Sequence, residues 1–272
     1  MYWPQSTCDA LRSLRACGWE WFELSTEHLA QLEEDSHQRA RIEEVLSTLA
    51  ELGLRMPQAH AHLPADIADP DESRREADMH LLHRQMACCA ALRIGHVVVH
   101  PGTGGGYTTR DEFQVIRELN VRNCSRLADQ AGELGLKVCL ENSMDHHGKR
   151  NFGARPEELL ELLAELDHPA LGICLDTSHA NVQKLDCAAA IRSFSRLLCC
   201  THISDNDGSG DQHLTPGGGN INWPSVTAAL RQIGYDGMFN LEIPGEMSPE
   251  PDILALKTRH ARGVAERLVQ RI

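Results

Sequence analysis

The sequence lacks any apolar run long enough to cross a membrane. No stretch of about 18 apolar residues occurs in the 272-residue chain. The N-terminus also lacks the basic flank and apolar core of a secretory signal. We therefore expect a cytoplasmic protein that does not bind membranes.

Paired cysteines and excess positive charge are missing as well. The ten cysteines include no CxxC pair and lie within apolar runs, which predicts reduced, buried thiols. The formal net charge of -13 argues against general affinity for nucleic acid, because such binding relies on Lys and Arg displacing counterions. A homo-oligomer is compatible with the sequence, which does not specify the oligomeric state.

Short apolar or β-branched runs alternate with amphipathic, Leu/Ala/Glu-rich stretches. This alternation predicts βα units around a parallel sheet, and the length suits one (β/α)₈ TIM barrel spanning residues 1–272. The predicted strands lie near residues 19–24, 55–62, 96–100, 136–142, 171–177, 198–204 and 238–243. One strand is short or missing: it should precede the first helix, which begins near Thr7, where only residues 1–4 remain as a stub.

Histidines and carboxylates occupy the C-terminal ends of these predicted strands. The residues are His60, His100, Glu141, Asp176, His202 and Glu242, and His179, Asp211 and His213 lie in the adjoining loops. All strand ends of a barrel open onto the one face that carries active sites, so these side chains should converge. Imidazole and carboxylate donors suit Zn²⁺, Mn²⁺, Mg²⁺, Co²⁺ or Fe²⁺ without distinguishing among them.

Several side chains near these positions have competing interpretations. His62 has the same strand parity as His60 and is an alternative ligand, although we prefer His60. Cys139, Cys174 and Cys200 each precede a predicted ligand by two residues and should fill the barrel interior beneath the site. Two glycine-rich segments, at 100–106 and 215–220, fit either an oxyanion-binding backbone or plain loop geometry.

As a set, these motifs resemble the xylose isomerase-like TIM barrel superfamily, in particular its sugar phosphate isomerase/epimerase branch, which is related to endonuclease IV-type barrels. The matching runs are His60-Ala61-His62, Val98-Val99-His100-Pro101-Gly102, Leu140-Glu141-Asn142, Leu175-Asp176-Thr177-Ser178-His179, His202-Ile203-Ser204-Asp205, residues 211–221 and Leu241-Glu242. They span nearly the whole chain.

The resemblance implies a divalent metal ion held by Glu141, Asp176, His202 and Glu242. It also implies that Glu141 and Glu242 transfer a proton through a metal-stabilised enediolate, as in metal-dependent sugar (phosphate) isomerases and epimerases. His179 and His62 would bind a small-molecule sugar or sugar phosphate substrate. Two departures, Gly208 where these epimerases have Arg and His147 where they have an acid, imply a different mode of sugar recognition.

Two other functions compete with this interpretation. The endonuclease branch uses the same four ligands plus positions matching His60, His100, His179, Asp211 and His213 in a multinuclear site for abasic-site phosphodiester hydrolysis. Residues 60–69, however, contain no Lys, Arg or aromatic side chain with which to grip or kink DNA. A non-catalytic barrel is the third alternative, and we expect the isomerase/epimerase.

Overall fold

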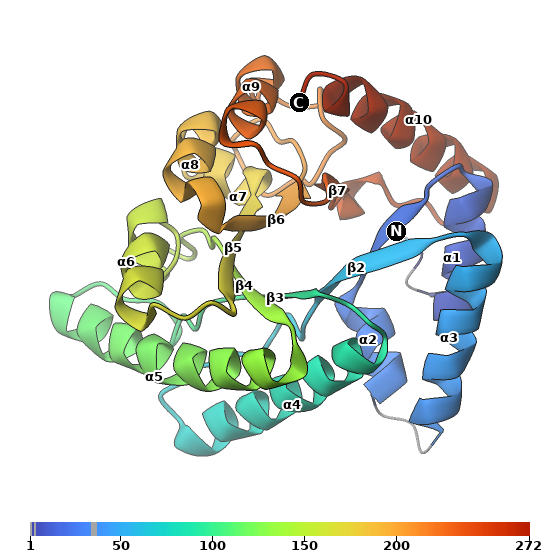
Figure 1. Cartoon of the computed structure of the whole chain (residues 1–272). Helices are drawn as coiled ribbons and strands as arrows, with labels where there is room; N and C mark the ends of the chain where they lie inside the picture. Colours follow the sequence, from blue (N-terminus) through green and yellow to red (C-terminus); the bar gives the residue numbers. More distant parts are fainter. Residues whose placement is uncertain (1, 3, 34–36) are drawn as a thin grey trace.

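The computed structural model describes residues 2, 4–33 and 37–272 of the chain. Its sheet is parallel and contains β1 (Trp21–Leu24), β2 (Arg55–His60), β3 (His96–Val99), β4 (Lys137–Glu141), β5 (Leu171–Asp176), β6 (Leu198–Ile203) and β7 (Asn240–Leu241). The strands are hydrogen-bonded in chain order, and helices surround them as an outer ring (Figure 1). The fold is therefore the predicted TIM barrel, with all seven predicted strands present.

Helices connect the strands on the outside of the sheet. They are α1 (Thr7–Ala16), α2 (Thr26–Glu33), α3 (Gln38–Leu52), α4 (Glu72–Ala91), α5 (Arg110–Leu134), α6 (Pro156–Leu166), α7 (Thr177–Val182), α8 (Cys187–Phe194), α9 (Trp223–Ile233) and α10 (Pro251–Val269), with 3₁₀ turns η1 (Ser195–Leu197) and η2 (Pro244–Glu246). In α6, Leu159, Leu162 and Leu163 are buried at helical spacing. Thr109 and Glu112 begin α5 with a capping box.

The central strands are buried on both faces, as parallel strands between a core and a ring of helices must be. Every residue of β5 is buried, which explains its continuous apolar sequence. Val98, Cys139, Cys174 and Cys200, one from each of four neighbouring strands, pack together as a fully buried cluster. The predicted thiol layer inside the barrel is confirmed, and it supports the residues that follow two positions later.

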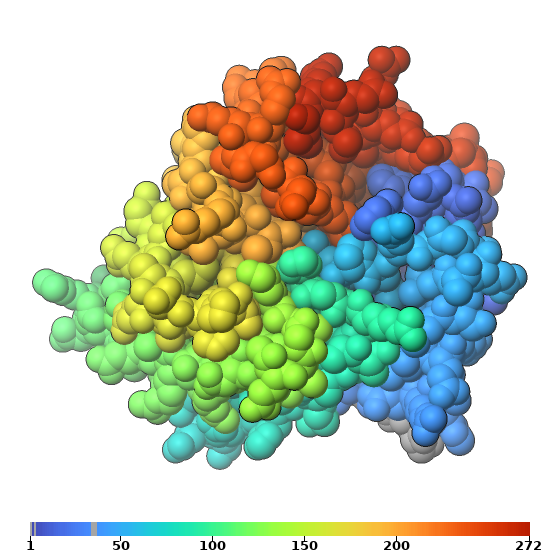
Figure 2. All heavy atoms as spheres, in the orientation of Figure 1, coloured from blue at the N-terminus to red at the C-terminus, as the bar shows by residue number. Residues whose placement is uncertain are grey.

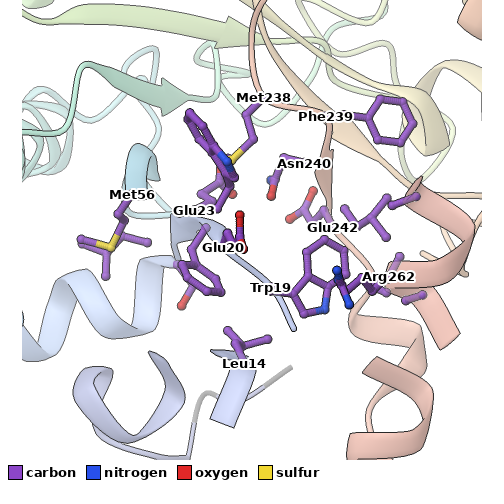
Figure 3. A pocket seen from close by; sticks show the side chains of 18 of the residues that line it. Leu14, Trp19, Glu20, Glu23, Met56, Met238, Phe239, Asn240, Glu242 and Arg262 are labelled. Atoms are coloured by element: carbon purple, nitrogen blue, oxygen red, sulfur yellow. The ribbon is translucent and has the colours of Figure 1, made fainter. Parts of the chain in front are cut away.

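A cavity separates the two ends of the sheet. Among the described residues no pairing joins β1 to β7, so these two are edge strands. A cavity of about 1050 Å³ lies between them, and Trp19, Glu23, Met238 and Glu242 are among its lining residues (Figure 3). In Figure 2 the N-terminal (blue) and C-terminal (red) parts of the chain adjoin on this side.

The predicted stub of an additional strand falls partly on Met1 and Trp3, which lie outside the described residues. Tyr2 is buried, and its hydroxyl lies 3.2 Å from Oγ1 of Thr258 in α10. Before α1, no strand is found in the part of the chain that the structure describes. None of the described helices combines the length and the apolarity that crossing a bilayer requires.

Substitution of Gly102 tests how closely the loop that follows β3 is packed. A Cβ on Gly102 would lie 2.2 Å from the backbone nitrogen of Ala68, a contact that no side-chain rotation can relieve. We expect Gly102→Ala to lower the free energy of unfolding by about 1–3 kcal/mol, measured by urea denaturation. Gly210→Ala is the matched control, because its Cβ would meet nothing within 4 Å. Equal stabilities of the two variants would contradict this packing.

Candidate metal centre

Four side chains from four strand ends meet at the mouth of the barrel. Glu141, Asp176 and His202 lie at or near the ends of β4, β5 and β6, and Glu242 directly follows β7. Each of the four offers a donor atom, and these atoms all lie within 4.8 Å of one another. Nδ1 of His202 is 3.1 Å from Oε1 of Glu141 and 3.1 Å from Oε2 of Glu242. Such a set of nitrogen and oxygen donors can bind a divalent cation.

Glu141 also belongs to a second donor group. The Nε2 atoms of His60 and His100 each lie 3.2 Å from Oε2 of Glu141. The Glu141 side chain is 1% exposed, so its charge is compensated by protein groups rather than by water. His62 is in none of the donor groups found among the described residues, and its backbone N–H donates to Gln85.

The remaining predicted residues form a third group beside the first. Asp176, His179 and His213 offer donor atoms within 4.8 Å of one another. Oδ2 of Asp211 lies 2.8 Å from Nε2 of His213 and 3.5 Å from Nε2 of His179. Eight of the nine predicted side chains thus fall in the three groups, and Asp211 contacts two of them.

Hydrogen bonds to carbonyl oxygens set the orientation of three of these imidazoles. Nδ1 of His60 donates to Ala61 at 2.8 Å, and Nδ1 of His179 donates to Asn142 at 2.8 Å. Nδ1 of His213 donates to the backbone oxygen of Glu242 at 3.0 Å. A carbonyl oxygen only accepts, so Nδ1 carries the proton in each ring. In the neutral ring, Nε2 then presents its lone pair to the site.

Two buried polar atoms at the centre make no hydrogen bond. Oδ1 of Asp176 caps α7 by accepting from the backbone nitrogen of His179 at 2.7 Å, whereas Oδ2 has no partner. Nδ1 of His202 is likewise without a hydrogen-bond partner, despite its two close carboxylate neighbours. Buried polar atoms without partners are costly, and a cation bound to both would remove that cost. The residues present therefore fit a metal ion.

Burial and the charges of neighbouring groups shift the pKa values of three of these side chains. Burial raises the pKa of Asp176 to about 7. For Glu242, burial raises the pKa, but the charge of His202 outweighs it and brings the pKa to about 2. For His213, burial lowers the pKa, whereas the hydrogen bond to Asp211 raises it to about 9. Protons thus balance the acids in the metal-free protein, and metal binding would release them.

A single aspartate organises the long loop between β6 and α9. Oδ2 of Asp205 accepts from the backbone nitrogen of Gly217 at 2.7 Å and from Nε1 of Trp223 at 2.9 Å. A Cβ on Gly219 would lie 2.1 Å from the backbone oxygen of Asn206. Close packing therefore accounts for the glycine at 219, and the loop positions Asp211 and His213.

Of two further residues that contact the site, the sequence pointed to Cys174, as a filler beneath it, but not to Glu23. Glu23, in β1, places Oε2 3.0 Å from Nε2 of His202. Cys174 shares a donor group with Glu141 and His202, but burial raises the pKa of its thiol well above the ordinary value. Cys174 is therefore a thiol rather than a ready ligand. For Glu23 the sequence offered no signal beyond an acid in a short predicted strand.

Comparison with known proteins identifies the family. A model of the xylose isomerase-like TIM barrel family matches residues 11–262, so the chain belongs to this family. Among solved structures, a D-tagatose 3-epimerase-like protein superposes with a TM-score of 0.80 at 23% identity, covering 98% of this chain and 96% of that one. At this identity the likeness establishes the fold alone.

The curated relatives include proteins named as epimerases and a protein named as an endonuclease. A ketose 3-epimerase of Arthrobacter globiformis is 33% identical over 129 residues, which cover 47% of this chain and 42% of the relative. A probable endonuclease 4 of Acholeplasma laidlawii is 24% identical over 221 residues, covering 75% and 71%. The chain spans about half the length of the curated relatives that it matches first.

Asp176→Asn tests whether the centre binds a metal. The amide has nearly the same shape but no charge, so we expect Mn²⁺ or Zn²⁺ affinity to fall by at least about 100-fold in calorimetric titration. In the unsubstituted protein, a metal at about 100 times its Kd should add about 2.7 kcal/mol of stability, which a chelator removes. Asp207→Asn, an exposed acid in the nearby loop, should bind metal normally. Equal affinities in the two variants would exclude Asp176 as a ligand.

Proposed function

We propose that the protein is a metal-dependent isomerase or epimerase that acts on a sugar or sugar phosphate. The observation that carries this proposal is the pair of carboxylates, Glu141 and Glu242, that approach one nitrogen of His202 at 3.1 Å each. Two acids from separate strands around one centre are what proton removal and proton return at a single carbon require. The ketose 3-epimerase among the relatives supports the same chemistry.

Glu141, Asp176, His202 and Glu242 would hold the divalent ion, which is Zn²⁺, Mn²⁺, Mg²⁺ or Co²⁺. Bound there, the ion stabilises negative charge that develops on the substrate oxygens. The unpartnered atoms of Asp176 and His202 support this assignment. His60, His100, His179, Asp211 and His213 are the additional donors of a multinuclear site.

The two glutamates carry the proton transfer. One carboxylate takes the proton from the carbon beside the substrate carbonyl, and the C–H electron pair moves into the enediolate. The other acid returns a proton to the opposite face, so no oxidant or reductant is needed. Glu242 has a side chain that is 27% exposed and lines the cavity, whereas Glu141 is 1% exposed. Glu242 is therefore the more accessible of the two groups to an incoming substrate.

Polar groups around Glu141 and Glu242 would orient the substrate. His179 is 13% exposed, and its ring lies between Glu141 and Asp211. We assign it to a sugar hydroxyl, with His62 at the rim as a second contact. Position 208 is glycine, and Lys184 donates to its backbone oxygen. Recognition of the far end of the sugar thus differs from that in the epimerases the sequence resembles.

Phosphodiester hydrolysis is the second candidate function. The three donor groups, which join through Glu141 and Asp176, favour it because clustered metals activate water in such enzymes. The relative named as a probable endonuclease 4 points the same way. The net charge of -13 and the absence of Lys, Arg and aromatic residues from 60–69 weigh against a DNA substrate.

Glu242→Gln tests the proton-transfer role. With metal supplied, we expect the variant to lose solvent-deuterium exchange at the substrate carbon by about 10²- to 10⁴-fold across D-psicose, D-fructose and D-tagatose and their phosphates. Deuterium incorporation is followed by NMR. Glu250→Gln, an exposed residue before α10, is the control and should exchange normally. Undiminished exchange in Glu242→Gln would reject the role assigned to this residue.

Metal stoichiometry separates the two candidate functions. The epimerase proposal predicts about one ion per chain by elemental analysis and no cleavage of an abasic DNA duplex. Three ions per chain together with chelator-sensitive cleavage would replace the proposal with hydrolysis. A protein that binds none of the four ions would instead be a non-catalytic barrel.

A further inference from the structure

Glu23 makes a contact that the proposed reaction does not explain. It lies in the edge strand β1, its side chain is 10% exposed, and Oε2 is 3.0 Å from Nε2 of His202. The amide of Gln58, in β2, donates to the same oxygen. Figure 3 shows Glu23 and Glu242 around the same cavity, on the two edges of the sheet. Glu23 thus contacts His202 from the side opposite the donor group.

The two nitrogens of His202 face different partners. Nδ1 points to Glu141 and Glu242, whereas Nε2 points to Glu23. An ionised carboxylate only accepts hydrogen bonds, so the proton belongs on Nε2. In the neutral ring the other nitrogen, Nδ1, then presents its lone pair to the centre. With the Glu23 side chain in place the imidazole of His202 is fully buried, so this carboxylate rather than water accepts from Nε2–H.

His202 differs in this respect from three other histidines of the site. His60, His179 and His213 donate Nδ1–H to backbone carbonyl oxygens, which side-chain substitution cannot remove. The Nε2–H of His202 depends on a side chain instead. A single substitution can therefore disturb the tautomer and ring orientation of His202.

We propose that Glu23 is the positioning residue that fixes the tautomer and ring orientation of His202 and so raises the affinity of the centre for its metal. Gln58, which is 2% exposed, holds the Glu23 carboxylate in place from the neighbouring strand. Glu23 belongs to none of the donor groups found among the described residues, so its effect on the metal would act through His202. The inference rests on the metal centre of the proposed function. Carboxylates that accept from metal-bound imidazoles have this role in other metal sites, where their loss weakens binding by about 10–100-fold.

Metal titration of the substituted full-length chain tests the proposal without any substrate. We expect Glu23→Ala to bind Mn²⁺ and Zn²⁺ about 10–100-fold more weakly in calorimetric titration. Glu23→Gln should recover part of this loss, because its amide oxygen can still accept from Nε2–H. Glu20→Gln is the control, since Glu20 lies just before the same strand in an exposed ion pair with Arg15 and should bind metal normally.

A spectroscopic measurement separates positioning from a general loss of structure. In the Zn²⁺-loaded protein labelled with ¹⁵N-histidine, we expect the His202 ring to show Nε2–H in the unsubstituted protein and in Glu23→Gln. In Glu23→Ala the Nε2–H signal should broaden through exchange with solvent. Melting temperatures of the metal-free variants monitor folding, and Glu23→Gln keeps the test available where Glu23→Ala does not fold.

These measurements distinguish a failure of the role proposed for Glu23 from a failure of the proposed metal centre. Unchanged metal affinity and an unchanged His202 spectrum in Glu23→Ala would overturn the role of Glu23 and leave the proposed function standing. Equal losses in Glu23→Ala and Glu20→Gln would also overturn it, because the effect would then be non-specific. Failure of the unsubstituted protein to bind any of the four ions would overturn the metal centre and, with it, the role of Glu23.

Discussion

The structure depends on how a buried negative charge at the mouth of the barrel is compensated. Three imidazole nitrogens, from His60, His100 and His202, lie within 3.2 Å of the Glu141 carboxylate. An ionised carboxylate away from water is costly unless paired and hydrogen-bonded. Protons on the imidazoles provide that compensation in the metal-free protein, and a divalent ion would do so with fixed geometry. The ends of β4, β5 and β6, the cap of α7 and the loop after β6 place the groups of this arrangement.

The parallel sheet brings the compensating groups together. Asp176 in β5 is in register with His202 in β6, and Glu141 in β4 is in register with Cys174, two positions before Asp176. Because side chains alternate along a strand, these inward-facing rows place the donors above a layer of small thiols. Asp205 then holds the loop that carries the outer donors. The site is thus built on rigid elements, with loops added around it.

Much of this arrangement could be predicted from sequence, and the exceptions have physical causes. The apolar runs predicted the seven strands, and the position of histidines and acidic residues at the strand ends predicted the metal donors. The expected strand at 238–243 shortens to Asn240–Leu241, since within residues 2, 4–33 and 37–272 β7 pairs with β6 and with no strand on its other side. Glu23 was missed because an acid in a short strand is indistinguishable in sequence from one that faces solvent.

Sequence alone determined which residues are strand, which are helix and which polar side chains end the strands, because those properties depend on local periodicity. Only the tertiary structure decided which atoms meet. Glu23 and His202 are 179 positions apart, and their contact exists because the sheet curves far enough to bring β1 opposite β6. The same curvature fixes which imidazole nitrogen faces the centre. Local sequence patterns do not determine such distances, because the distances depend on the packing of the whole barrel.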